Sequence, residues 1–169
     1  MSFVPEGWQA SSSELAGKTI LVTGANRGIG EAVALNCAQH GAEVLLLGRD
    51  EASLTCVYDQ IVDLGCPTPG IIPLDLTTRD NALYDTLADE LSGANVALDG
   101  LVHNAGVLGE RRMLAQTSPA SWDEVLQVNM TAVFLLTRAL MPCSKRPRRP
   151  RSCSQALAWG EEVKPIGAL

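Results

Sequence analysis

Short apolar runs alternate along the chain with longer segments whose apolar residues recur at helical spacing. The runs have the length and composition of strands that are buried on both faces. We predict four strands, at Ile20–Val22, Ala42–Leu47, Gly70–Leu74 and Ala97–His103. The longer segments predict helices that begin at Glu31 and end at His40-Gly41, and that cover Asp50–Leu64, Thr78–Leu91 and Ser121–Met141.

This alternation predicts an α/β fold with a doubly wound parallel sheet, covered by helices on both faces and joined by right-handed crossovers. Ligands in such sheets bind beyond the carboxyl ends of the strands. The residues that follow each predicted strand are therefore the candidates for a binding site, namely residues 24–30, 48–50, 75–76 and 103–106.

A glycine-rich loop follows the first predicted strand. Gly24, Gly28 and Gly30 are spaced G-x-x-x-G-x-G, directly before helix-forming sequence. Glycine allows a sharp turn and the close approach of a pyrophosphate, and the N–H groups at a helix start favour negative charge. Three glycines alone also fit a strand-to-helix turn without a ligand.

The later strand ends resemble, together with this loop, the short-chain dehydrogenase/reductase family over residues 15–142. Residues 23–30 are similar to its T-G-x-x-x-G-x-G loop, and Asp75-Leu76 to the pair that contacts adenine. Asn104-Ala105-Gly106 is similar to the end of its N-N-A-G motif, with His103 in place of the first asparagine. The resemblance implies a Rossmann-like fold and a set of cofactor-binding residues: Thr23, Gly24, Asn26, Arg27, Gly28, Ile29, Gly30, Asp75, Leu76, Asn104, Ala105 and Gly106.

The end of the second predicted strand indicates which dinucleotide binds. A carboxylate at this place accepts hydrogen bonds from a ribose 2′-hydroxyl, whereas a 2′-phosphate requires cations. Leu47 is followed by Gly48 and Arg49, and Arg27 in the glycine loop is a second cation. We therefore predict an NADP site that includes Arg49, with NAD as the alternative if Asp50 is the acidic partner.

The catalytic residues that the resemblance implies are mostly missing from the sequence. Asn129 matches the family's helix asparagine, which helps to hold a water in the proton relay, but no serine-rich fifth strand and no Tyr-x-x-x-Lys pair are found. Tyr58 is followed four residues later by Val62, and Tyr84 by Ala88. The implied activity is hydride transfer between NADP(H) and a small carbonyl or alcohol substrate, and the alternative is an inactive dinucleotide-binding fragment.

The charge distribution changes near Pro142. Residues 1–142 hold 7 basic and 17 acidic residues, a net charge of −10, whereas residues 143–169 hold 6 basic and 2 acidic residues, a net charge of +4. Five cations and two prolines in Cys143–Ser154 exclude a central strand there. We predict an N-terminal extension at residues 1–14, a dinucleotide-binding portion at 15–142, and a disordered basic tail at 143–169 for which nucleic-acid binding is the less favoured role.

The family's sheet does not end at a fourth strand. We therefore interpret the fold as incomplete after the fourth strand and the helix that follows it, with a truncation or a shifted reading frame as the hypothesis for the tail. Without a fifth strand, Leu98–Val102 would be a bare apolar edge. The oligomeric state stays open, since family dimers commonly pair the last helix with one that this sequence lacks.

The remaining composition adds expected absences. Five scattered cysteines and two histidines predict neither a disulfide framework nor a metal site. The first residues lack the pattern of a signal peptide, and no apolar run approaches the ~20 residues that span a bilayer, so we expect a cytoplasmic protein without a membrane partner.

Overall fold

The computed structural model describes residue 11 and residues 13–144, which divide into two compact units at the Asp75–Leu76 bond. The predicted basic tail, apart from Cys143 and Ser144, lies outside the described residues, as does most of the predicted N-terminal extension.

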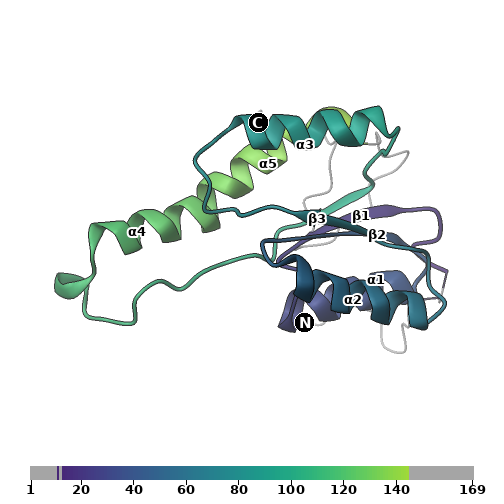
Figure 1. Cartoon of the computed structure of the whole chain (residues 1–169), viewed down its shortest axis with the longest axis horizontal. Helices are drawn as coiled ribbons and strands as arrows, with labels where there is room; N and C mark the ends of the chain where they lie inside the picture. The colour runs from purple at the N-terminus through teal and green to yellow at the C-terminus, as the bar shows by residue number, and fades with distance from the viewer. Residues whose placement is uncertain (1–10, 12, 145–169) are drawn as a thin grey trace, which may run out of the picture. The chain divides into compact units, whose positions relative to one another are not determined.

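Three parallel strands form the centre of the N-terminal unit (Figure 1). They are β1 (Thr19–Thr23), β2 (Glu43–Gly48) and β3 (Gly70–Pro73), with β2 in the middle. In the register of the sheet, Leu21 lies opposite Leu45, and Leu46 opposite Ile71. Every residue of β1 and all but Glu43 in β2 are buried, as predicted for strands covered on both faces.

Two helices of this unit lie on the same face of its strands, as Figure 1 shows. They are α1 (Gly28–Gln39) and α2 (Glu51–Asp63). From α2 the side chains of Leu54, Val57 and Ile61 are buried, at the spacing that the sequence predicted. The helices therefore bury one apolar stripe each, and they leave the carboxyl ends of the strands at one edge of the sheet.

The C-terminal unit is mainly helical. Its elements are α3 (Ala82–Gly93), β4 (Gly100–Val102), a 3₁₀ turn η1 (Leu114–Gln116), α4 (Pro119–Leu126), η2 (Gln127–Thr131), α5 (Ala132–Leu140) and a 3₁₀ turn η3 (Met141–Cys143). The core between α3 and α5 is built from large buried side chains: Tyr84, Leu87, Leu91, Leu135, Leu136 and Leu140.

The bounds of the third helix and of the fourth strand differ from the prediction. The third helix begins at Ala82 and not at Thr78, because the Thr78 hydroxyl and the Asp80 carboxylate accept hydrogen bonds from the backbone N–H groups of Asp80 and Ala82. Leu83 is 43% exposed, and Tyr84 occupies the buried position in its place. The fourth strand is only three residues long, shorter than the predicted Ala97–His103.

The last predicted helix begins at Pro119, two residues before the predicted Ser121, and it contains a π turn. Ser118 caps α4 by accepting a hydrogen bond from the Ser121 N–H, and Pro119 suits the first helical position. At Gln127–Thr131 the helix widens to a π turn, in which carbonyl groups are bonded five residues ahead. The spacing of Val128 and Ala132 gave no sign of this wide turn, because both residues are buried as in an α-helix.

Residues 119–143 together form a helical run of 25 residues that is long and apolar enough to cross a membrane, by length and composition only. The expectation that no apolar run approaches this length was therefore wrong. Core helices of soluble proteins meet the same criterion, and Leu135, Leu136 and Leu140 of this run are buried in the C-terminal unit.

The predicted bare edge at Leu98 is also wrong. The Leu98 N–H donates to the Cys143 carbonyl at 2.8 Å, and Leu98 forms an isolated parallel bridge with Ser144. Leu98 is 1% exposed and Leu101 is fully buried. Ser144, directly after η3, therefore covers this edge at Leu98.

Candidate functional site

The glycine loop follows β1 directly and leads into α1. Thr23 is the last residue of β1, and Gly24 and Gly28 have φ angles of +64° and +60°. A Cβ atom added at Gly28 would meet no protein atom within 4 Å. Gly28 is therefore required for its backbone conformation, and the space beside it is open.

The amino end of α1 is open to an anion. Arg27, in an extended conformation, precedes the helix, and its side chain forms no hydrogen bond that caps the first turn. Ile29, in that first turn, is 76% exposed. Unbonded N–H groups and the helix dipole favour a phosphate at this position.

The end of β2 lies beside this loop. The Ala25 N–H donates to the Leu47 carbonyl at 3.2 Å, and a Cβ atom added at Gly48 would lie 3.3 Å from Leu54 Cδ2 and 3.6 Å from Asn26 Oδ1. A side chain at Gly48 would therefore be tight against Leu54 of α2, whereas Asn26 in the loop would stay at an ordinary contact distance.

Three charged residues lie at or beside this strand end. Asp50 precedes α2, and its carboxylate accepts a hydrogen bond from the Ser53 hydroxyl. Arg49 and Arg27 are exposed, and within the described part of the chain neither guanidinium forms an ion pair. Beside the glycine loop, the end of β2 therefore offers two exposed cations and one carboxylate that is bonded to Ser53.

The end of β3 joins the same edge. The Leu74 N–H donates to the Gly48 carbonyl at 2.9 Å, and Asp75 follows as an exposed residue. The N-terminal unit thus brings together the predicted residues of three strand ends, from Thr23 to Gly30, at Arg49 and at Asp75. Leu76 is the first residue of the C-terminal unit, where it is partly buried.

In the C-terminal unit, the predicted Asn104-Ala105-Gly106 follows β4 and is held by the helical run. Asn129, in the π turn, donates from Nδ2 to the Val107 carbonyl and accepts from the Val107 N–H through Oδ1, both at 2.9 Å. Both polar atoms of the Asn129 amide are thus used to fix the backbone directly after Gly106. A role for Asn129 in holding a water stays a prediction.

On the other side of the same segment, His103 follows β4 directly. Its Nε2 lies 2.8 Å from the hydroxyl oxygen of Thr137 on α5, within hydrogen-bond distance. Burial lowers the pKa of His103 below its ordinary value, so the ring is neutral near neutral pH. The sequence identified His103 only as a departure from the family motif, and gave no signal for Thr137.

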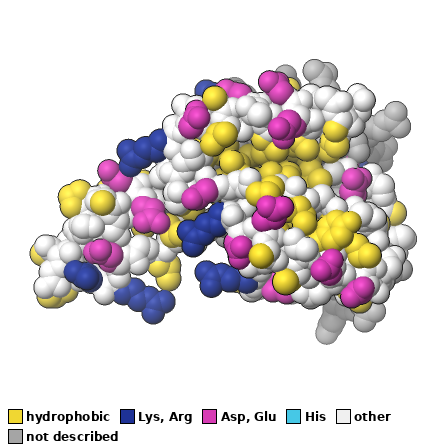
Figure 2. Space-filling model, in the orientation of Figure 1, with side chains coloured by type: hydrophobic (Ala, Val, Ile, Leu, Met, Phe, Trp, Pro, Cys, Tyr) yellow, Lys and Arg dark blue, Asp and Glu magenta, His cyan; other side chains and the backbone are white. Residues whose placement is uncertain are grey.

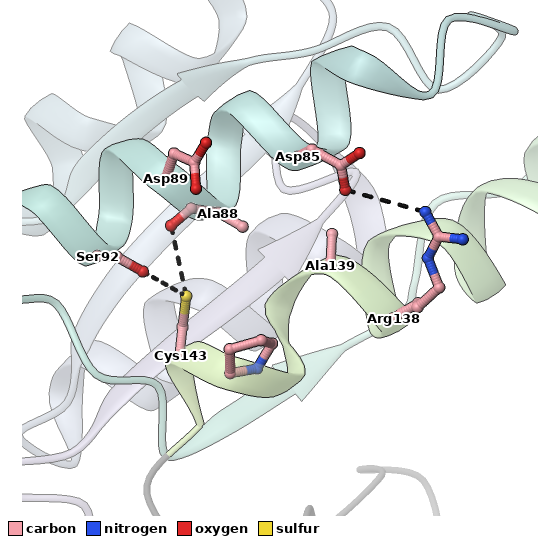
Figure 3. A pocket seen from close by; sticks show the side chains of 8 residues that line it. Asp85, Ala88, Asp89, Ser92, Arg138, Ala139 and Cys143 are labelled. Carbon is pink, nitrogen blue, oxygen red and sulfur yellow. Dashed lines mark hydrogen bonds and ion pairs between the residues drawn. The ribbon is translucent and has the colours of Figure 1, made fainter.

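A pocket of about 330 Å³ lies between α3 and α5, but it is not part of the predicted site (Figure 3). Asp85 and Arg138 form an ion pair of 3.9 Å at its edge, and the Cys143 thiol lies 3.2 Å from the Ser92 hydroxyl and donates to the Ala88 carbonyl. None of the predicted cofactor-binding residues lines it. Among the described residues, no group of three or more His, Cys, Asp or Glu side chains is arranged to hold a metal ion.

The family model named short chain dehydrogenase matches residues 18–150. The chain belongs to the short-chain dehydrogenase family. Among solved structures, a short-chain dehydrogenase from Pseudomonas syringae is 47% identical, with a TM-score of 0.77, and the match covers 80% of this chain and 55% of that one. This likeness confirms the predicted Rossmann-like α/β fold class.

Two further short-chain dehydrogenase relatives bear on function. The uncharacterized oxidoreductase YciK of Escherichia coli K12 is 39% identical over 135 residues, which are 80% of this chain and 54% of that protein. A short-chain dehydrogenase from Escherichia coli CFT073, solved in complex with NADPH, is 39% identical with a TM-score of 0.76, over 79% of this chain and 55% of the other. The chain thus spans about half the length of the relatives that it matches.

Proposed function

We propose that this short-chain dehydrogenase chain binds NADP(H), and that the protein transfers a hydride between this cofactor and a carbonyl or alcohol carbon of a small molecule. Membership of an oxidoreductase family and the NADPH bound to a relative support the proposal. The comparisons lend no support to the alternative of an inactive fragment.

The residues of the N-terminal unit fit a dinucleotide. The open space at Gly28 and the uncapped start of α1 suit the pyrophosphate, which the backbone N–H groups would bind. Asp75 would lie at the adenine. Asn104-Ala105-Gly106, in the C-terminal unit, stay predicted cofactor-binding residues. When bound, the cofactor supplies a hydride from nicotinamide C4, and a carbonyl substrate that accepts it also takes up a proton.

The observation that carries the choice of NADP is the presence of two exposed cations, Arg49 after β2 and Arg27 in the glycine loop. Arg49 is the second residue after Leu47, and Arg27 precedes α1, and neither has an ion-pair partner among the described residues. A guanidinium binds a 2′-phosphate through paired charge-assisted hydrogen bonds. The neighbouring Asp50 carboxylate is bonded to Ser53 instead.

The experiment is a titration of the chain with NADPH and with NADH, followed by nicotinamide fluorescence. Arg49→Ala removes one charged hydrogen-bond donor. This variant should bind NADPH about 10- to 100-fold more weakly and NADH nearly as well as the unaltered chain does. Arg49→Lys keeps the charge but not the paired donors, so its NADPH affinity should lie between those of the unaltered chain and of Arg49→Ala. Arg138→Ala, which removes an exposed arginine from α5, is the control and should alter neither affinity. Equal losses for both cofactors in Arg49→Ala would contradict the proposal.

A second experiment tests hydride transfer. The chain is mixed with NADPH and a panel of ketones, and the loss of NADPH absorbance is followed. The sequence has no Tyr-x-x-x-Lys pair, and Tyr84 is 1% exposed in the core of the C-terminal unit. Turnover would therefore require another proton donor. Binding without turnover would restrict the role of this chain to holding the cofactor.

A further inference from the structure

The Asn104-Ala105-Gly106 segment is attached to one helical run at both of its ends. Before it, His103 Nε2 meets the Thr137 hydroxyl at 2.8 Å, and after it, the Val107 backbone is held by the Asn129 amide through two bonds of 2.9 Å. The two anchor residues on the helix are eight positions apart, with Thr137 bonded to the earlier end of the segment. The segment and the helix therefore run in opposite directions.

Four peptide steps separate His103 from Val107, and a segment of this length spans at most about 13 to 14 Å. No turn or bend interrupts residues 103–110. Because both ends are hydrogen-bonded to the same helical run, the backbone between them is restrained.

The side chains of His103 and Thr137 are suited to fixing the start of the segment. His103 is partly buried, and burial holds its pKa low, so the ring keeps one form near neutral pH. Thr137 lies in α5 beside the fully packed Leu136, which restricts the movement of its backbone. A hydrogen bond of 2.8 Å between two partly buried side chains fixes the start of the segment to α5.

We propose that His103 and Thr137 are positioning residues, which together with Asn129 hold Asn104-Ala105-Gly106 extended for cofactor binding. This inference rests on the proposed function, because it gives these two residues a role in binding the cofactor. Neither residue touches the cofactor in this role; both act through the segment between the anchors.

The test compares NADPH affinity with thermal stability in variants of the full chain. Thr137→Val removes the hydroxyl at nearly constant volume, and it should raise the NADPH dissociation constant by roughly 2- to 10-fold, the effect of one net hydrogen bond. Thr137→Ser keeps the hydroxyl and should bind as the unaltered chain does. Thr86→Val is the matched control, since Thr86 also donates a 2.9 Å hydrogen bond, to the Ala82 carbonyl on the exposed face of α3. Thr86→Val should change the melting temperature and leave NADPH affinity unchanged.

The histidine is tested in the same way. His103→Ala should weaken NADPH binding by a similar factor, and the double variant His103→Ala with Thr137→Val should lose no more than either single variant, because the same bond is removed. His103→Gln places an amide nitrogen near the position of Nε2 and should restore binding. It also provides a comparison should the valine variant fail to fold.

The outcomes separate the two proposals. If the unaltered chain fails to bind NADPH, the proposed function fails and this inference fails with it. If the unaltered chain binds NADPH and Thr137→Val binds equally well, or if His103→Gln binds as weakly as His103→Ala, the inference alone is overturned.

Discussion

Replacing Gly28 with alanine separates the binding role of the glycine loop from its role in folding. Gly28 has a φ of +60° and no protein atom lies within 4 Å of the position that a Cβ would take. Gly65, at the end of α2, has a φ of +69° and is equally open. Gly65→Ala is thus a matched control with the same backbone penalty at a place far from the predicted loop in sequence.

The expected losses of stability follow from the positive φ and the open surroundings that Gly28 and Gly65 share. Alanine at a positive φ costs about 1 kcal/mol, so each variant should lower the melting temperature by roughly 2–4 °C. In Gly28→Ala alone, the added methyl group enters the space through which a phosphate approaches the backbone. Losing one hydrogen bond from a backbone N–H to a charged phosphate costs about 1.5–3 kcal/mol, or roughly a 10- to 150-fold loss of affinity.

The assay is a titration with NADPH followed by nicotinamide fluorescence, with thermal melts of the same samples without cofactor. We expect equal melting temperatures for the two variants and weakened binding for Gly28→Ala only. Unchanged NADPH affinity in Gly28→Ala, or an equal loss in Gly65→Ala, would refute the assignment of this loop to the phosphates.

Three further predictions concern stability. Ile61→Ala, at a fully buried position in α2, should lower the free energy of unfolding by about 2–5 kcal/mol in urea titrations, and a loss below 1 kcal/mol would contradict the packing of this helix. Asn129→Ala removes both bonds to Val107, but because Asn129 is exposed the loss should be only about 1 kcal/mol, measured in the same way, while NADPH affinity falls; an unchanged affinity would argue against the anchor. Burial lowers the pKa of His103 in the folded chain, so the unfolded chain takes up the proton first as the pH falls. Stability should therefore be full above about pH 6.5 and fall below it. Urea midpoints compared across this range should show a weaker fall in His103→Gln.

The strand ends were predictable because their signal is local. Apolar runs followed by Gly24, Gly48 or Asp75 identify both the strand and the edge at which it ends, and the topology of parallel strands brings these ends together. The start of α3 was not predictable from apolar spacing, since the side chains of Thr78 and Asp80 compete for the backbone N–H groups that a helix would use.

Contacts between residues distant in sequence gave no signal. His103 and Thr137 are 34 positions apart, and each alone fits an ordinary strand end or helix position. The π turn at Gln127–Thr131 keeps the apolar spacing of an α-helix, so only the hydrogen bonds of the structure show it. The coverage of Leu98 by Ser144 was missed for a related reason, because the cations and prolines after Ser144 argued against any pairing in that segment.

The surface over α4 carries exposed apolar side chains among charged ones. Figure 2 shows hydrophobic, basic and acidic side chains mixed over α4 and the loop before it. Among the hydrophobic ones, Leu108, Met113, Leu114 and Trp122 are each more than half exposed. Nothing in the described residues covers this surface, and it lies outside the segment that the two anchors hold.

The two units hold their parts of the predicted site by different means. In the N-terminal unit, backbone bonds from Ala25 to Leu47 and from Leu74 to Gly48 fix the loop and strand ends. In the C-terminal unit, the segment after β4 depends on three side chains of His103, Asn129 and Thr137. Binding should therefore tolerate most substitutions beside the glycines, apart from those of ligand-binding side chains such as Arg49. It should be sensitive to conservative changes at polar positions of the helical run that do not reach the cofactor.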